Sequence, residues 1–149
     1  MWIRDITQAY TQSTTLLQRK ILACLPKEIE ELYPRGTIMV VLKPLYGVAE
    51  AGTHWWATYF KHHREKLYMT TSTYNPCLLI TTAKERFAIV GMQTDDTLGL
   101  SDSRFITLEQ DKLDKAGFTA KSKETLTTTE SLQFNGCILT LNNNSTITL

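Results

Sequence analysis

Short apolar runs alternate with two longer stretches of helical period along the whole chain. This alternation is typical of an α+β domain, in which helices cover one face of a sheet. The chain has 149 residues, 42% of them hydrophobic, which is enough to bury a core without disulfides or metals. We therefore expect residues 1–149 to form a single domain, with a small antiparallel sheet backed by two helices.

Two stretches predict the helices. Residues 49–68 contain no proline, and one stripe of helical spacing runs along them with Trp55 at its margin. The members of this stripe are Trp56, Tyr59, Phe60, His63 and Leu67. Residues 104–116 follow a capping cluster at 101–103 and stop at Gly117, a residue type suited to the position after a helix. Both helices are expected to back the sheet.

Short β-branched and apolar runs predict the strands. They lie at residues 2–6, 21–25, 37–42, 77–82, 86–92 and 97–100, with one or two more between 132 and 141. The run at 37–42 is strongly apolar, so we expect it to be buried. Residues 27–36 are polar and contain Pro34 and Gly36, which predicts a loop.

The charge balance limits what the chain can bind by itself. Its formal net charge is +1, so the basic excess of a self-sufficient nucleic-acid binder is missing. Cys24, Cys77 and Cys137 suit neither a disulfide framework nor a zinc site, which favours reduced thiols in the cytoplasm or nucleus. Without a signal-peptide core or an apolar run of about 18 residues, we expect no membrane association.

Two adjacent aspartates, Asp95 and Asp96, follow an apolar strand directly. Like charges this close repel by roughly 1 to 4 kcal/mol, which favours a bound cation. Successive strand side chains point to opposite faces, so the pair can share a cation only at a turn, with residues 97–100 as the return strand. If the strand that ends near Asp5 lies alongside, three carboxylates converge as ligands for Mg²⁺ or Mn²⁺. By spacing alone, a turn or helix cap is the commoner role of an Asp-Asp pair.

Several stretches together resemble the reverse transcriptase of copia-type retrotransposons in order and spacing. Residues 4–10 (Arg-Asp-Ile-Thr-Gln-Ala-Tyr) are similar to the first aspartate motif of that family. Residues 42–55 (Leu-Lys-Pro-Leu-Tyr-Gly-Val-Ala-Glu-Ala-Gly-Thr-His-Trp) resemble its Leu-Tyr-Gly-Leu-Lys-Gln-Ala element and the Trp that follows. Residues 93–96 stand at its Tyr-Val-Asp-Asp position, and residues 75–78 and 134–136 resemble two shorter motifs. The resemblance covers nearly the whole chain.

This resemblance implies a ferredoxin-like polymerase palm and RNA-directed DNA polymerase chemistry. It gives Asp5, Asp95 and Asp96 the catalytic role of holding two Mg²⁺ or Mn²⁺ ions during nucleotidyl transfer. It places Tyr10 beneath the nucleotide sugar, where the ring would reject a 2′-hydroxyl, and Glu50 near the incoming nucleotide. The implied partners are a template-primer and a dNTP. The fingers, thumb and RNase H parts of the family have no counterpart in residues 1–149.

The departures from the family concentrate where nucleotide would be contacted. Ala49 and Glu50 replace Lys-Gln, Thr53 replaces a basic residue, and residues 93–94 replace Tyr-Val. A carboxylate at position 50 repels a triphosphate, and each lost phosphate contact weakens nucleic-acid binding. We therefore expect activity that is weak or absent in the chain alone.

Three hypotheses stay open at this point. The first is a palm domain that binds divalent cations through its aspartates. The second is a non-catalytic, domesticated or degenerate retrotransposon remnant, which binds a partner or forms a homodimer through surfaces that fingers and thumb would cover. The third is an unrelated ferredoxin-like binding module, which requires the motif matches to be coincidental.

Overall fold

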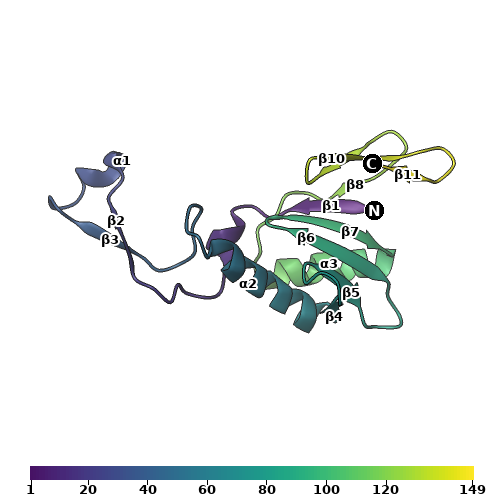
Figure 1. The fold of residues 1–149 in the computed structure, drawn as a ribbon, viewed down its shortest axis with the longest axis horizontal. Coiled ribbons are helices and arrows are strands. Elements are labelled where there is room, and N and C mark those ends of the chain that lie inside the picture. Colours follow the sequence, from purple (N-terminus) through teal and green to yellow (C-terminus); the bar gives the residue numbers. More distant parts are fainter.

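The computed structural model describes residues 1–149 as a body from which an arm projects (Figure 1). The strands are β1 (Trp2–Asp5), β2 (Ile21–Cys24), β3 (Ile38–Val41), β4 (Met69–Thr71), β5 (Leu78–Thr81), β6 (Ala88–Gln93), β7 (Asp96–Ser101), β8 (Glu124–Thr125), β9 (Leu132–Phe134), β10 (Cys137–Leu141) and β11 (Ile147–Thr148). The helices are α1 (Lys27–Glu30), α2 (Ala51–Lys66), α3 (Ser103–Ala116) and the 3₁₀ turn η1 (Ala9–Gln12). None of them is long and apolar enough to cross a membrane.

A six-stranded sheet in the order β4-β5-β6-β7-β1-β8 forms the centre of the body, and all its neighbouring strands are antiparallel. Helices α2 and α3 lie on one face of this sheet (Figure 1). Alternate residues of each strand point toward them, as Ala88, Val90 and Met92 of β6 do. The predicted α+β class, with two helices behind an antiparallel sheet, is confirmed.

The buried face of α2 differs from the predicted stripe. Trp55 is only 2% exposed and packs in the core with Tyr59, whereas Trp56 and Phe60 are half-buried at its edge. The rings of Trp56 and Phe60 stack on each other with centroids 5.0 Å apart. The predicted stripe is therefore turned by about one residue, because Ala51 and Trp55 are buried where the stripe predicted Trp56 and Phe60.

Trp2 and Gly99 lock strands β1 and β7 in register. They are direct partners in the β1–β7 ladder, and a Cβ added to Gly99 would lie 2.1 Å from the indole of Trp2. The indole donates a hydrogen bond to Ser101 Oγ at 2.8 Å, and Lys123 Nζ lies 4.4 Å from the ring centroid. Only glycine leaves room for this ring, so the register is fixed at the N-terminal end of β1.

A buried ion cluster ties α3 to β1. Arg4 and Glu109 are both almost fully buried, and the guanidinium donates to Glu109 Oε2 at 2.9 Å. Lys123, which precedes β8, donates to the same oxygen at 2.8 Å. A buried charge is tolerated only when it is paired, so these three residues hold helix α3 and strand β8 against β1.

The opposite face of the sheet is only partly covered. The small sheet β11-β10-β9 lies over the end that contains β1, where Ile3, Leu126, Leu132 and Leu139 form a second core. Figure 1 shows this sheet on the side away from α2 and α3. The predicted terminal strands correspond to β9 and β10, while β8 and β11 were not predicted. The outer face of β5–β7 has no layer on it.

The arm consists of β2, α1 and β3, and its two strands pair only with each other (Figure 1). A strand at 37–42 was predicted and is present, but the prediction that it is buried is wrong. Ile38 and Val40 are 58% and 47% exposed. Residues 27–36 were predicted as a loop, and their first four form α1. An apolar strand thus stands in solvent because no other part of the chain covers it.

The Trp2–Gly99 contact predicts a sharp difference between two glycines of the same sheet. Gly99→Ala should destabilise the protein by about 1 to 3 kcal/mol, because the new methyl group collides with a buried indole. Gly91→Ala meets no atom closer than 4.0 Å and should change stability by less than about 0.5 kcal/mol. Urea unfolding followed by tryptophan emission measures both. Equal effects would mean that Trp2 does not lie over Gly99.

Candidate functional site

Asp5 and Asp96 lie side by side on the sheet. They are direct partners in the β1–β7 ladder, so their side chains point to the same face. The Cβ atoms of such partners are about 4.5 to 5.5 Å apart. Neighbouring Arg4 and Thr97 are buried toward the helices, which places both carboxylates on the outer face of the sheet. The sequence left open whether the strand that ends near Asp5 lies beside the strands of the aspartate pair. In the structure, β1 pairs directly with β7, the strand that follows the turn.

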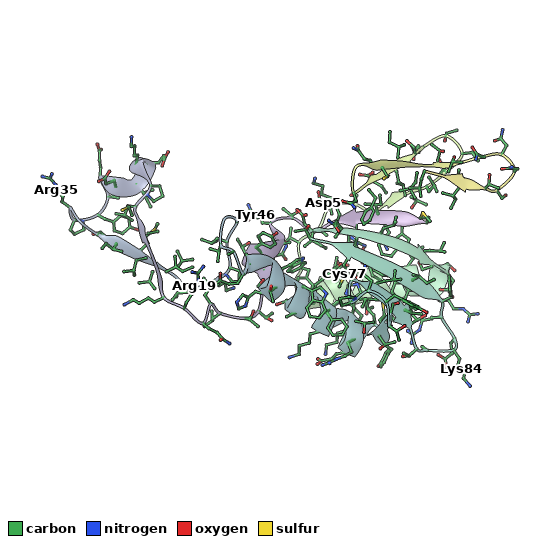
Figure 2. All side chains as sticks on the ribbon, in the orientation of Figure 1. Asp5, Arg19, Arg35, Tyr46, Cys77 and Lys84 are labelled. Carbon is green, nitrogen blue, oxygen red and sulfur yellow. The ribbon has the colours of Figure 1, made fainter.

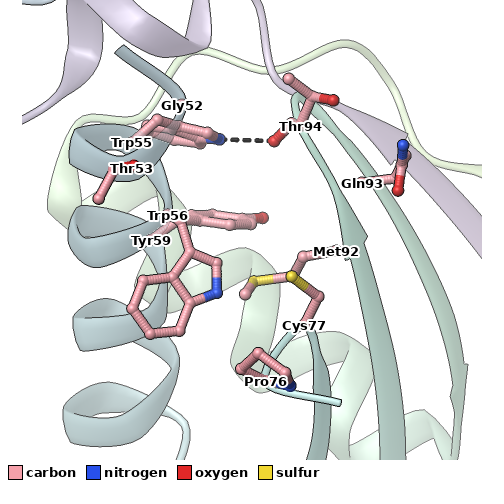
Figure 3. Close-up of a pocket in the computed structure, with 10 residues that line it drawn as sticks. All are labelled: Gly52, Thr53, Trp55, Trp56, Tyr59, Pro76, Cys77, Met92, Gln93 and Thr94. Atoms are coloured by element: carbon pink, nitrogen blue, oxygen red, sulfur yellow. Dashed lines mark hydrogen bonds between the residues drawn. The ribbon is translucent and has the colours of Figure 1, made fainter. Parts of the chain in front are cut away.

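Asp95 occupies the two-residue turn between β6 and β7, beside Thr94. The predicted hairpin with an acidic tip is therefore present. Two contacts hold the turn: the Ile6 N–H donates to the Asp95 carbonyl at 2.9 Å, and the indole of Trp55 donates to the Thr94 carbonyl at 2.7 Å (Figure 3). Thr94 has a φ of 54°, which strains a β-branched residue. The surrounding contacts thus hold the acidic tip in a strained conformation.

The charges of the three aspartates act on one another. Burial, followed by the charges of Asp95 and Asp5, raises the pKa of the Asp96 carboxyl above its ordinary value. The ammonium of Lys121 opposes this rise. A carboxylate that is desolvated beside two others attracts cations. The three carboxylates predicted to act together therefore lie at one end of the sheet.

Lys121 supplies a cation from within the chain. Its Nζ lies 2.5 Å from Asp5 Oδ2, and its backbone N–H donates to the Asp5 carbonyl at 2.9 Å. No three His, Cys, Asp or Glu side chains are grouped in a way that could hold a metal ion as they stand. Sequence inspection missed this contact, because 116 residues separate Lys121 from Asp5 and no local pattern links them.

Two tyrosines flank the carboxylates. Tyr10, on η1, and Tyr46 have ring centroids 4.5 Å apart. Burial, followed by the charge of Asp95, raises the pKa of the Tyr46 hydroxyl. Figure 2 shows Tyr46 at the base of the arm, close to the end of the sheet that carries Asp5. Tyr10 was predicted as a site residue. Tyr46 was not, although it belongs to the Leu-Tyr-Gly element singled out in the sequence.

Glu50 directly precedes α2 and is paired with Arg19. The guanidinium donates two hydrogen bonds to the carboxylate, at 2.5 and 2.8 Å. The bond from Arg19 lowers the pKa of the Glu50 carboxyl below its ordinary value. The negative charge at position 50, noted in the sequence as repulsive to a triphosphate, is thus balanced by a residue at the start of the arm.

A pocket of about 480 Å³ lies on the helix side of the hairpin (Figure 3). Trp56, Cys77 and Met92 form much of its wall, and no charged residue lines it. Gln93 and Thr94, at the start of the acidic turn, form one edge of the pocket. The carboxylates of Asp5 and Asp96 point to the opposite face of the sheet, so the pocket and the acidic site are distinct.

Neither a protein-family model, nor a curated protein, nor a solved structure matches this chain. The chemistry of the site is therefore inferred from its own residues. These are three carboxylates on adjoining strands and a turn, one ammonium held against them, and two tyrosines at their side. Carboxylate oxygens are the ligand type that hard cations prefer, and the ammonium of Lys121 occupies the exposed side of Asp5 in this structure.

The raised pKa of Asp96 predicts an unusual effect on stability. The folded state binds a proton at Asp96 more readily than the unfolded chain does, so the ionised carboxylate costs stability above its folded pKa. Asp96→Asn should raise the free energy of unfolding at neutral pH by less than about 1 kcal/mol, since water screens a partly exposed group. The gain should vanish as the pH falls below the ordinary value of 3.8.

Asp102 is the matched control for this experiment. It caps α3 and accepts hydrogen bonds from the backbone N–H groups of Phe105 and Phe87, which lower the pKa of its carboxyl. Asp102→Asn should therefore lose stability at neutral pH, the opposite sign to Asp96→Asn. Urea unfolding at a series of pH values measures both. A loss of stability in Asp96→Asn at neutral pH would contradict the mutual repulsion.

Proposed function

We propose that the chain is a polymerase palm of the copia-type reverse transcriptase kind, whose Asp5, Asp95 and Asp96 bind Mg²⁺ or Mn²⁺ for nucleotidyl transfer. The observation that carries this proposal is the direct pairing of Asp5 with Asp96 across β1 and β7, with Asp95 in the adjoining turn. Two ions bound there would stabilise the attacking and leaving oxygens of an in-line displacement. The chain's own part is to hold the carboxylates in place.

The order of elements supports the same proposal. Along the chain, β1, α2, β6, β7, α3 and β8 follow the βαββαβ sequence of a ferredoxin-like unit. In the sheet these strands lie in the order β6-β7-β1-β8, with both helices on one face. The first strand and the central hairpin are thereby neighbours, although about 90 residues separate them along the sequence.

The proposal requires Lys121 to give way to the metal. Its ammonium lies against Asp5 on the exposed side of the site, and a surface ion pair of this kind is weak. A divalent cation that contacts all three carboxylates would displace it. Tyr10 and Tyr46 would then border the bound ion on the side of the arm, where a nucleotide sugar is expected by the resemblance.

Metal titration tests the proposal. Calorimetric titration should show Mn²⁺ binding to the wild-type chain and at least about tenfold weaker binding to Asp95→Asn/Asp96→Asn, because two charged oxygen ligands are lost. Lys121→Met should bind Mn²⁺ more tightly, by up to about fivefold, since an exposed ion pair contributes no more than this. Glu28→Gln/Glu30→Gln, on the arm, is the matched control and should bind like the wild type. Equal Mn²⁺ binding by the wild type and the double aspartate variant would refute the metal site.

A primer-extension assay separates this function from the second candidate, a non-catalytic remnant. With an RNA template, a DNA primer and Mn²⁺, we expect slow extension by the wild type and none by Asp95→Asn/Asp96→Asn. The rate should be low because Ala49, Glu50 and Thr53 stand where the resemblance implies contacts to the triphosphate, and Arg19 is engaged with Glu50. Mn²⁺ binding without any extension would favour the non-catalytic candidate, which the uncovered apolar surfaces of the chain also support.

A further inference from the structure

The arm is apolar on both faces. Strands β2 (Ile-Leu-Ala-Cys) and β3 (Ile-Met-Val-Val) contain no polar residue. Their register pairs Leu22 with Val40 and Cys24 with Ile38, and these four side chains form the more exposed face of the ribbon. An antiparallel ribbon with a solvated face normally alternates apolar and polar residues, and an isolated two-stranded ribbon is barely stable in water. Burial of the exposed face of the arm against another surface would therefore stabilise it.

The body has a second uncovered apolar surface, the outer face of β5–β7. Ile80, Ile89 and Leu100 lie directly opposite one another in the ladder and form a row across the three strands. Phe87, next to this row, is about half exposed, as are Ile80 and Leu100. The small sheet β9–β11 reaches only the β1 end of this face. The face thus lacks a covering layer over its other half.

We propose that two copies of this chain exchange arms, so that the Leu22–Val40 face of each arm lies on the Ile80–Ile89–Leu100 row of the other copy. The arm projects away from its own body, whereas a second copy can bring its arm to the uncovered face (Figure 1). The exchange is reciprocal, since each copy gives its arm and receives the arm of the other, so the pair has twofold symmetry. It is independent of the proposed metal chemistry.

The amount of apolar surface favours exchange over a contact between two arms. Seven large side chains of the arm are exposed: Leu16, Leu22, Leu32, Tyr33, Ile38, Val40 and Leu42. At about 100 Å² for a fully exposed side chain, two contacts between the Leu22–Val40 face and the row with Phe87 cover roughly 700 Å² of apolar surface, whereas two ribbon faces packed on each other offer roughly 400 Å². With the usual apolar share, the larger value corresponds to roughly 1,200 Å² in all, the lower end of the range for specific interfaces.

Charge at the two ends agrees with this arrangement. At the tip of the arm, next to β2, three glutamates (Glu28, Glu30 and Glu31) outnumber the two cations Lys27 and Arg35. In the turn between β5 and β6, at the far end of the outer face, Lys84 and Arg86 outnumber Glu85. Figure 2 places the tip residue Arg35 and Lys84 at opposite ends of one molecule, so an arm laid along a second copy can bring its acidic tip to that basic turn. Such charges set the direction of docking more than its strength.

Sedimentation equilibrium over a range of concentrations tests the exchange. The wild type should sediment at twice the 17.0 kDa mass of one chain. Leu22→Lys/Val40→Lys on the arm and Ile89→Lys on the outer face should each be monomeric. Tyr74→Lys, at a site that is 96% exposed and outside both surfaces, should remain a dimer. All three tryptophans lie in the body, so their emission and the circular dichroism show whether each variant is folded. Leu100→Lys replaces Ile89→Lys if the latter does not fold.

Mixing the two monomeric variants provides the sharper outcome. In an exchange, the intact arm of the Ile89→Lys chain can dock on the intact outer face of the Leu22→Lys/Val40→Lys chain. The mixture should therefore recover a heterodimer with one of the two contacts, weaker than the wild-type dimer. A contact between two arms recovers nothing on mixing and would leave Ile89→Lys dimeric. Either result overturns the proposal. A wild type that stays monomeric at high concentration also overturns it, even if the arm binds a different protein.

Discussion

The pairing of β1 with β7 is the constraint on which the rest of the structure depends. Trp2 lies over Gly99, the one position in β7 where its ring fits, and this contact sets the register of the whole ladder. Register in a sheet is decisive, since a shift of one residue would turn every side chain of β1 to the other face. In the observed register Arg4 enters the core to meet Glu109, and Asp5 comes to lie beside Asp96. The β1–β7 register therefore determines both the packing of the core and the position of the candidate site.

The sequence predicted those features that depend on local pattern. Helical spacing and capping residues located α2 and α3, and the acidic pair after an apolar strand located the turn of the β6–β7 hairpin. Contacts between distant segments, such as Lys121 with Asp5 or Arg19 with Glu50, could not be predicted from the sequence, because no local spacing indicates them. The apolar run at 37–42 was expected to be buried because its side chains are hydrophobic. Hydrophobicity does not tell which other segment covers a strand, and here no segment of the chain does so. The family assignment stays a prediction that rests on the motifs.

The arm and the candidate site are joined through two connections. The segment that leaves the body toward β2 carries Arg19, and the segment that returns from β3 carries Tyr46 and Glu50. The Arg19–Glu50 ion pair links the two segments at the base of the arm, where Tyr46 meets Tyr10. A partner that covers the arm would therefore also restrain the tyrosine side of the acidic site.

Paramagnetic broadening of amide signals by Mn²⁺ tests the central claim, that three aspartates brought together by the β1–β7 register form one cation site. In a ¹⁵N-labelled chain, we expect substoichiometric Mn²⁺ to broaden the amide signals of Asp5, Asp95, Asp96 and Lys121 together, while those of the arm glutamates Glu28 and Glu30 stay sharp. Broadening limited to one of these aspartates, or spread equally over all acidic residues, would contradict a shared site.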